Sequence, residues 1–472
     1  MANEPAILLN RLVLWLLPVV FVGAAGVAAL SAARAAQAES KLDARLQQII
    51  AIYNLRPLQI RQYSADPEMR LGQALFFDPV VSGNRDVSCS SCHLLSYGLT
   101  DGLPRSIGVG GVGFGPGRHL SHGLSIHPRR SLDLWNRDNN AVSSFFWDGH
   151  VEVLDSRKRI FRSPMGTALP LGFQNAMAVQ SVVPLTVPDE MLGTYRSYSS
   201  PALPEPHRNQ INDLVTQHSY PSIASMMQSV YQRLLKRLLG LDAKPYPWQN
   251  KYRQMFAEAY PQKRMSQISI VDIGNAIAHF EEMGFAANAA PWDDYLGGDT
   301  SAISREAKEG AILFYGRARC AVCHAGPMFS DFQYHSVGIF SKITVNGKLV
   351  NDYGRWMVTG NERDRYRFRT PPLRNVTGRP LLFHDGSSSS LAQAILRHVN
   401  PLARAGGYMP DGSFAMDRGQ IESVSPLLTE KLALTDDDVE ALIAFLGTLA
   451  SQSRDKSQII PQRVPSGLSF IR

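Results

Sequence analysis

The chain has 472 residues, of which 44% are hydrophobic and 19% are charged. This composition is ordinary for a folded protein of two or more domains and excludes an intrinsically disordered chain. The net charge of +7 is small for this length, and no long run of lysine and arginine is present, so nucleic-acid binding is not expected.

The N-terminal segment, residues 1–38, is expected to be a signal peptide or an N-terminal membrane anchor. Arg11 is followed by a stretch from Leu12 to Ala33 without a charged residue, and Ala36-Gln37-Ala38 suits a signal peptidase. Cleavage there would start the mature chain near Glu39. The uncharged stretch is also about as long as a membrane span, so an uncleaved anchor is the alternative. With either outcome the body of the protein is expected to lie in the periplasm.

All four cysteines fall in two copies of a Cys-x-x-Cys-His motif, Cys89-Ser90-Ser91-Cys92-His93 and Cys320-Ala321-Val322-Cys323-His324. This spacing is typical of c-type haem attachment, in which each thiol adds to a vinyl group and the histidine binds the iron. A zinc site would need more ligands on the same loop, and a redox dithiol would lack the histidine. Two disulfides are a third alternative. Because the motif occurs twice and no cysteine is left over, two covalent haems are favoured, with His93 and His324 as proximal ligands.

The rest of the chain is expected to be mainly helices joined by long loops. Glycines crowd residues 102–128, which are predicted to be a loop because no strand precedes them and no Lys-Ser/Thr pair follows. Helices are expected after Ser269 and after Thr435, where apolar residues recur at helical spacing and Asp438 completes a capping box with Thr435.

One stretch is the expected linker between two domains. Residues 197–221 are polar and rich in proline. The predicted division is therefore an N-terminal haem domain over residues 39–220 and a C-terminal one over residues 221–472.

Further segments serve as landmarks along the chain. They are Leu71-Gly72-Gln73-Ala74-Leu75-Phe76-Phe77-Asp78, Phe146-Trp147-Asp148-Gly149, Trp292-Asp293-Asp294-Tyr295-Leu296, Phe368-Arg369-Thr370-Pro371-Pro372-Leu373-Arg374-Asn375 and Phe383-His384-Asp385-Gly386. Together with the two motifs, this order resembles the bacterial dihaem cytochrome c peroxidases and their MauG-type relatives. The resemblance implies a mainly α fold of two cytochrome c-like haem domains with long irregular loops. It also implies that peroxide reacts at the N-terminal haem and that electrons from a small donor protein enter at the C-terminal haem.

Gln180 and Glu190 lie ten residues apart, as the family's distal glutamine and glutamate do. Peroxide cleavage needs a group that moves a proton between the two oxygens, and a carboxylate over an open iron can do this. The resemblance therefore implies that Glu190 is the acid–base residue and Gln180 its polar neighbour. From the residues alone, a solvated loop carboxylate is the commoner explanation of Glu190, and Asp189 is a competitor.

Trp147 resembles the tryptophan that lies between the two haems of the family and relays electrons. Its neighbours Phe145 and Phe146 are aromatic, so simple core packing is the alternative. The interval from Trp147 to Gln180 is longer than in the short peroxidases.

The sixth ligand of the first haem departs from the family. Ordinary members carry a histidine after Ser-Ile-Gly, where this chain has Val109, so the first haem is expected to be five-coordinate. His119, His122 and His127 lie downstream and could supply a displaced ligand, but exposed loop histidines are the favoured interpretation.

The second haem needs a stable sixth ligand. His398 stands where the family has methionine or tyrosine, fourteen residues after His384, and Met409 is a competitor. Two histidine ligands would give a lower potential than histidine with methionine. Calcium between the domains is doubtful, because Arg130 and the region of Arg379 take the places of its ligands.

Three functions follow from these features. The first is a periplasmic peroxidase that reduces hydrogen peroxide with electrons from a cytochrome c or a cupredoxin. The second is a MauG-like enzyme that oxidises Trp or Tyr of a partner protein, which Val109 favours and His398 weakens. The third is a dihaem electron carrier without catalysis.

Overall fold

The computed structural model describes residues 17–58, 63–120, 126–194, 212–215, 219–240, 246–287, 290–345, 348–401, 418–428, 432–451 and 456–471. Its α-helices are α1 Leu17–Tyr53, α2 Pro67–Phe77, α3 Ala176–Val182, α4 Ile223–Leu239, α5 Pro247–Ala259, α6 Ile270–Gly284, α7 Pro291–Leu296, α8 Arg305–Tyr315, α9 Trp356–Thr359, α10 Leu391–Val399, α12 Arg418–Ser423, α13 Asp436–Gly447 and α14 Lys456–Ile459. Its strands are β1 Gly111–Val112, β2 His119–Leu120, β3 Ser144–Phe145, β4 Val151–Asp155, β5 Ile160–Arg162, β6 Tyr334–His335, β7 Lys342–Val345, β8 Lys348–Asn351 and β9 Phe368–Arg369.

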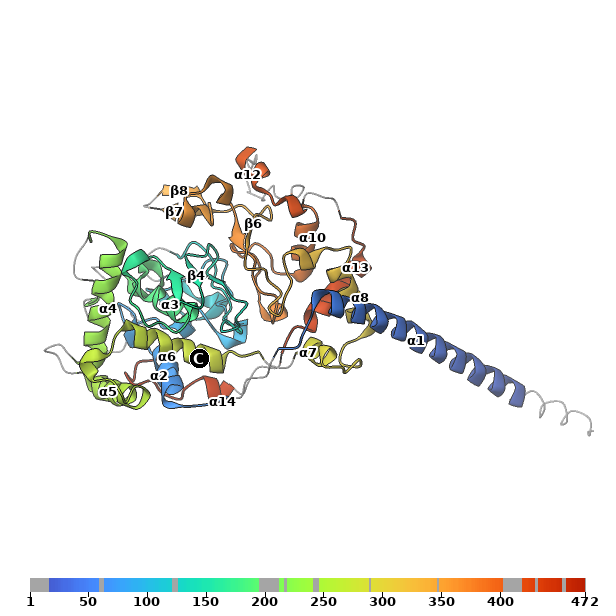
Figure 1. The fold of residues 1–472 in the computed structure, drawn as a ribbon, viewed down its shortest axis with the longest axis horizontal. Helices are drawn as coiled ribbons and strands as arrows, with labels where there is room; N and C mark the ends of the chain where they lie inside the picture. The colour runs from blue at the N-terminus through green and yellow to red at the C-terminus, as the bar shows by residue number, and fades with distance from the viewer. Residues whose placement is uncertain are drawn as a thin grey trace, which may run out of the picture.

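The architecture is helical with little sheet, which confirms the mainly α prediction (Figure 1). The described strands form small antiparallel sheets, of which β3-β4-β5 has three strands and the others have two. Long connections run between the helices. The described residues of the glycine-rich stretch 102–128 lie in a loop, as predicted, apart from β1, β2 and short turns.

Local signals set the helix ends. Helix α6 begins after Ser269, and α13 begins after Thr435, as predicted. The backbone N–H of Asp438 donates to the Thr435 hydroxyl at 3.2 Å, and the Asp438 carboxylate accepts from the Thr435 backbone at 2.9 Å. These reciprocal bonds satisfy amide groups that the first helical turn leaves without partners.

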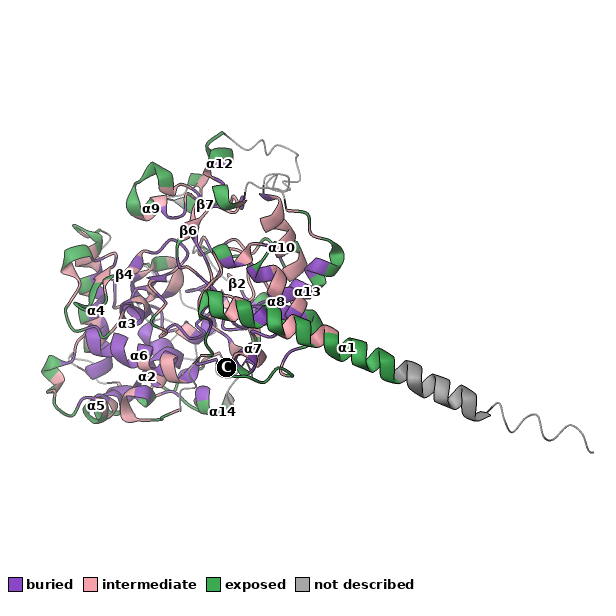
Figure 2. Cartoon of the chain, turned by 45° about the vertical axis from the view of Figure 1, so that its right-hand side comes forward, coloured by how far each residue is buried: buried purple, intermediate pink, exposed green. Residues whose placement is uncertain are grey.

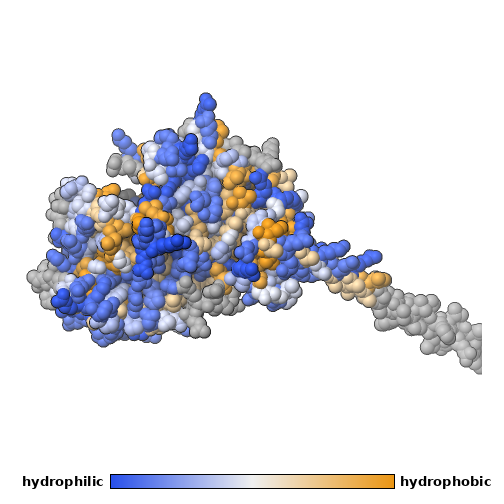
Figure 3. Space-filling view, viewed as in Figure 1, coloured by the Kyte–Doolittle hydropathy of each residue, from blue (hydrophilic) through white to orange (hydrophobic). Residues whose placement is uncertain are grey.

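The apolar side chains gather in two buried clusters. Helices α2 to α6 supply the N-terminal core, and α7, α8, α10 and α13 supply most of the C-terminal core. Figure 2 shows α2, α3 and α6 largely buried, whereas the face in Figure 3 is mostly hydrophilic with separate apolar patches.

The same close helix crossing occurs in both cores. A Cβ on Gly72 of α2 would lie 1.8 Å from the carbonyl oxygen of Ala276 in α6, and a Cβ on Gly310 of α8 would lie 1.8 Å from that of Ala441 in α13. Only glycine permits such an approach of two backbones. The two cores therefore share one helix-pair design.

The domain boundary predicted at residue 220 stays a prediction. Helices α4, α5 and α6 follow that point and pack with α2 and α3 in the N-terminal core, which also includes Met328 and Ile459 from later in the chain. Most residues of the C-terminal core lie from Trp292 onward. Amphipathic helices belong to the core that covers their apolar face, and a polar linker-like stretch carries no information about which core that is. Most of the predicted linker lies outside the described residues.

Helices near both ends of the described chain pack against the cores. Leu46 of α1 is buried in the C-terminal core, and Lys308 of α8 pairs with Glu39 at 2.7 Å and with Asp43 at 2.9 Å. At the other end, Ile459 of α14 lies in the N-terminal core. In Figure 1 α1 projects away from α8 and α13. Within the described part of the chain, no helix combines the length and apolar character that a membrane crossing requires.

Candidate functional site

The two Cys-x-x-Cys-His motifs adopt the same local fold. Each starts with a single 3₁₀ turn, Cys89–Ser91 or Cys320–Val322. In each, the histidine N–H donates to the carbonyl of the first cysteine, at 3.0 Å for His93 and 2.9 Å for His324. The four cysteines form no disulfide, so the disulfide alternative has no support.

Both motif histidines are oriented for metal binding. His93 Nδ1 lies 3.0 Å from the carbonyl oxygen of Leu99, and His324 Nδ1 lies 2.9 Å from that of Phe329. A ring nitrogen that faces a carbonyl must donate, so Nε2 of each ring is left as the lone-pair nitrogen. Leu99 and Phe329 both have positive φ, a strained conformation that persists only where the surroundings fix it. Burial lowers the pKa of both histidines, which favours the neutral, ligating form.

The first motif lines a cavity of about 270 Å³. Gln180 and Glu190 line this same cavity, so the structure brings the two predicted residues together with Cys89 and His93. Gln180 lies on α3, and its Oε1 is buried without a hydrogen-bond partner among the described residues. Glu190 lies in a π-helical turn, Pro188–Leu192, an uncommon element that often occurs at functional sites.

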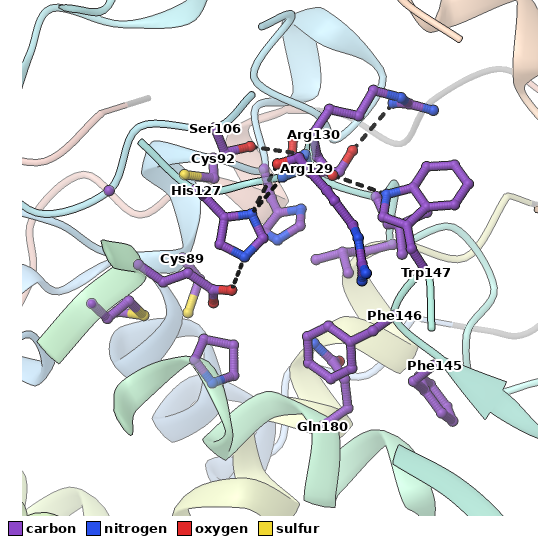
Figure 4. A pocket seen from close by; sticks show the side chains of 18 of the residues that line it. Cys89, Cys92, Ser106, His127, Arg129, Arg130, Phe145, Phe146, Trp147 and Gln180 are labelled. Atoms are coloured by element: carbon purple, nitrogen blue, oxygen red, sulfur yellow. Dashed lines mark hydrogen bonds and ion pairs between the residues drawn. The ribbon is translucent and has the colours of Figure 1, made fainter. Parts of the chain in front are cut away.

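The structure corrects the interpretation of His127 as an exposed loop residue. Its Nε2 lies 2.8 Å from Glu190 Oε1, and its side chain lines the first cavity (Figure 4). His119 is exposed as predicted, and His122 lies outside the described residues. No local pattern distinguishes His127 from these neighbours, because the contact with Glu190 joins segments far apart in the sequence.

Val109 is buried in the N-terminal core and is not among the residues that line the first cavity. Its backbone N–H donates to the Glu190 carbonyl at 2.9 Å. The backbone of Val109 therefore helps to hold the segment that contains Glu190, the predicted acid–base residue.

The second motif lines a cavity of about 190 Å³, and His398 lies in the same cavity. The ring centres of His324 and His398 are 6.4 Å apart. An imidazole nitrogen binds a metal ion at about 2 Å, so two imidazoles on opposite sides of one ion have ring centres roughly 6 Å apart. His398 Nδ1 donates to the Ala394 carbonyl at 2.8 Å, which leaves its Nε2 free. This pair thus fits an iron held between two histidines. Met409 lies outside the described residues.

Three residues, Arg130, Trp147 and Arg369, line both cavities. The Trp147 indole N–H donates to the Arg130 carbonyl at 3.0 Å, and its ring lies 6.3 Å from that of His384. Figure 4 shows Trp147 beside Arg130 at one edge of the first cavity. Trp147 is therefore placed between the two cavities.

Arg369 could bind an anionic group of a cofactor. The sequence did not indicate this role. Both terminal nitrogens of its guanidinium are buried, and neither has a hydrogen-bond partner among the described residues. Burial, followed by the charge of Arg137, lowers the pKa of Arg369 to about 9. A buried cation is costly without a counter-charge, and the carboxylates of a haem would supply one. The residues present therefore fit a haem in both cavities.

Arg130 and Arg379 lie where the sequence predicts an altered calcium site. Arg130 Nε donates to the Phe383 carbonyl at 2.6 Å, and an Arg379 terminal nitrogen donates to the Pro372 carbonyl at 2.9 Å. Arg379 also pairs with Asp133 at 3.1 Å. These guanidinium groups carry positive charge and bind protein oxygens in this region, and an altered calcium site stays a prediction.

Comparison with known proteins agrees with this geometry. A family model described as di-haem cytochrome c peroxidase matches residues 66–301. The chain is 28% identical to the methylamine utilization protein MauG of Methylorubrum extorquens, over 93% of this chain and 95% of that protein. It is 27% identical to a cytochrome c551 peroxidase of Nitrosomonas europaea, over 83% and 82%. A crystal structure of a MauG-like protein associated with microbial copper homeostasis shares the fold, with a TM-score of 0.56 at 22% identity over 87% of this chain and 95% of that one.

Proposed function

Because this chain belongs to the di-haem cytochrome c peroxidase family, we propose that it is a periplasmic enzyme that reduces hydrogen peroxide to water. The electrons come from a small redox protein, a cytochrome c or a cupredoxin. One observation carries the proposal: Glu190 and Gln180 line the cavity of the first Cys-x-x-Cys-His motif.

The thiols of Cys89 and Cys92 would hold one haem through thioethers, and those of Cys320 and Cys323 would hold the other. When bound, the haems would supply irons that exchange electrons and, in the first cavity, a place where peroxide reacts. The imidazole of His93 would bind the iron in the first cavity, and those of His324 and His398 would bind the iron in the second. The guanidinium of Arg369 would pair with haem carboxylates.

The overall reaction consumes one hydrogen peroxide, two protons and two electrons and yields two water molecules. The Glu190 carboxylate takes the proton from the near oxygen of peroxide and delivers it to the far oxygen, which leaves as water. The Gln180 amide, whose Oε1 has no hydrogen-bond partner in the described part of the protein, orients the peroxide. Trp147 assists electron transfer between the two cavities.

A MauG-like activity is the second candidate, in which oxidising equivalents pass to Trp or Tyr of a partner protein. The match to MauG over almost the whole chain supports it. The side chain of Val109, which cannot bind iron, also supports it, since an open first site would react without prior reduction.

Stopped-flow mixing of the holoprotein with hydrogen peroxide and a reduced cytochrome c tests the proposal. We expect two donor molecules to be oxidised for each peroxide consumed. Peroxide consumption that leaves the donor reduced would favour the MauG-like activity, and no reaction with peroxide in either the diferric or the half-reduced state would leave only an electron carrier.

A further inference from the structure

His127 makes a hydrogen bond through each ring nitrogen. Nδ1 lies 2.9 Å from the Arg129 carbonyl oxygen and 3.4 Å from the Arg129 backbone nitrogen, and Nε2 lies 2.8 Å from Glu190 Oε1. A carbonyl oxygen only accepts, so the shorter of the two contacts at Nδ1 places a hydrogen on that nitrogen. With an ionised Glu190, Nε2 must also donate, and the ring is then an imidazolium. The geometry therefore describes an ion pair that faces the first cavity.

The glycine-rich segment before His127 holds both partners. The His127 N–H donates to the Ser106 carbonyl at 2.9 Å, and the Val109 N–H donates to the Glu190 carbonyl at 2.9 Å. A Cβ on Gly108 would lie 2.0 Å from that same Glu190 oxygen, so only glycine fits there. One short segment thus fixes the backbones of His127 and Glu190 relative to each other.

We propose that His127 is a positioning residue that holds the Glu190 carboxylate ionised and aimed into the first cavity, as the charged partner of the acid–base residue. This inference rests on the proposed peroxidase function. His127 keeps both its protons throughout. The proton that moves comes from the near peroxide oxygen, passes to Glu190 and ends in the leaving water, so the count of atoms and electrons given above is unchanged.

The electrostatics of the cavity agree with this role. Burial lowers the pKa of His127, but the charges of Glu190 and Asp189 outweigh burial and raise it to about 9. Burial raises the pKa of Glu190, but His127 outweighs burial and holds it below its usual value, with smaller contributions from His150 and His93.

The other charged groups around the pair have their own partners. His150 Nδ1 lies 2.6 Å from Asp148, and the Arg129 guanidinium binds Asp148 at 2.7 Å and Asp352 at 2.8 Å. His127 is therefore the only described cation whose side chain bonds directly to Glu190.

The competing role for His127 is iron ligation. Its two nitrogens both bind protein oxygens, so neither is left with a free lone pair. Ligation would require the ion pair with Glu190 to break.

The test is cyanide binding to the purified diferric holoprotein, measured from pH 5 to 9 in the wild type, His127→Gln, His127→Lys and Glu190→Gln. Hydrogen cyanide must give its proton to a base when cyanide binds, so the acid limb of the rate profile reports the ionisation of Glu190. An opposite charge at this range shifts a carboxyl pKa by about 1–3 units. We expect His127→Gln to move the acid limb up by about one pH unit or more, and His127→Lys to restore it in part. His119→Gln, in the same loop but exposed, is the matched control and should keep the wild-type profile.

The outcomes separate the inference from the function on which it rests. An unchanged acid limb in His127→Gln, together with slow binding in Glu190→Gln, overturns the role of His127 and leaves Glu190 as the base. Wild-type rates in Glu190→Gln overturn the proposed acid–base residue itself. A low-spin electron paramagnetic resonance signal that His127→Gln converts to high spin would identify His127 as an iron ligand and also overturn the inference. Haem content and circular dichroism confirm that each variant is folded.

Discussion

The indole of Trp147 lies edge-on to the imidazole of His384, with the ring centres 6.3 Å apart and the planes at 69°. His384 in turn stacks on Phe368 at 3.6 Å, and Arg130 lies over the Trp147 ring at 5.3 Å. Trp147 lines both cavities. These contacts therefore hold a ring that can be oxidised in a fixed position between the two cavities.

Replacing Trp147 with phenylalanine should slow electron transfer between the two sites while both haems remain bound. The indole is a better electron relay than a phenyl ring, and the hydrogen bond to the Arg130 carbonyl is lost. Stopped-flow spectroscopy of the half-reduced protein after peroxide addition measures this rate. Trp135→Phe is the control, because Trp135 is equally buried but is not among the residues that line either cavity. Equal rates in the two variants would exclude a relay role.

Glu190→Gln should lower the rate constant for the reaction with peroxide by about 10²–10⁴-fold, the usual contribution of an acid–base group. Asp189→Asn is the contrasting variant, since Asp189 lines the same cavity without the bond to His127. Its effect should be much smaller. The reverse order of effects would transfer the acid–base role to Asp189.

His398→Met should raise the reduction potential of the second haem, because methionine ligation raises the potential relative to a second histidine. Spectroelectrochemistry with electron paramagnetic resonance measures both the potential and the change of ligand. His335→Gln is the control: His335 lines the same cavity, but its Nε2 binds Asp331 at 2.9 Å. A change of the potential in His335→Gln and none in His398→Met would identify His335 as the ligand in place of His398.

Glu281→Gln should stabilise the protein near pH 8 and have little effect near pH 4.5. Burial raises the pKa of Glu281 to about 8, only partly countered by Arg137, and none of the described residues hydrogen-bonds to its Oε2. A carboxyl with a raised folded-state pKa is favourable at low pH, and that stability is lost as the pH rises from the unfolded value of about 4.3 through the folded value. Thermal unfolding at both pH values measures the difference. The neighbouring Glu282→Gln, where Glu282 pairs with His279, should not show this pH dependence.

Gly310→Ala should lower the melting temperature, because its Cβ would overlap the Ala441 carbonyl of the facing helix. Overpacking of this kind costs about 1–3 kcal/mol. Gly447→Ala is the control, since nothing lies within 4 Å of its Cβ position. Alanine is favoured over glycine in a helix by about 1 kcal/mol, so this variant should be neutral or more stable. Calorimetry of the two variant holoproteins measures both melting temperatures. A melting temperature of Gly310→Ala at or above that of the wild type would contradict the prediction.

Features that depend on local spacing could be predicted from the amino-acid sequence. Two thiols and a histidine within five residues specify their own chemistry, and a capping residue followed by apolar residues at helical intervals specifies a helix start, as at Ser269 and Thr435. The order of the family's landmarks likewise identified the family. None of these requires knowledge of which segments meet in space.

Features that depend on long-range packing could be recognised only in the three-dimensional structure. Three features were not predicted: the ion pair of His127 with Glu190, the two terminal nitrogens of Arg369 that lack a hydrogen-bond partner among the described residues, and the inclusion of α4 to α6 in the N-terminal core. A histidine or arginine looks alike in a sequence whether it is solvated or buried, because its environment is supplied by segments far away in the chain. Burial and the positions of those segments turn such residues into parts of a site.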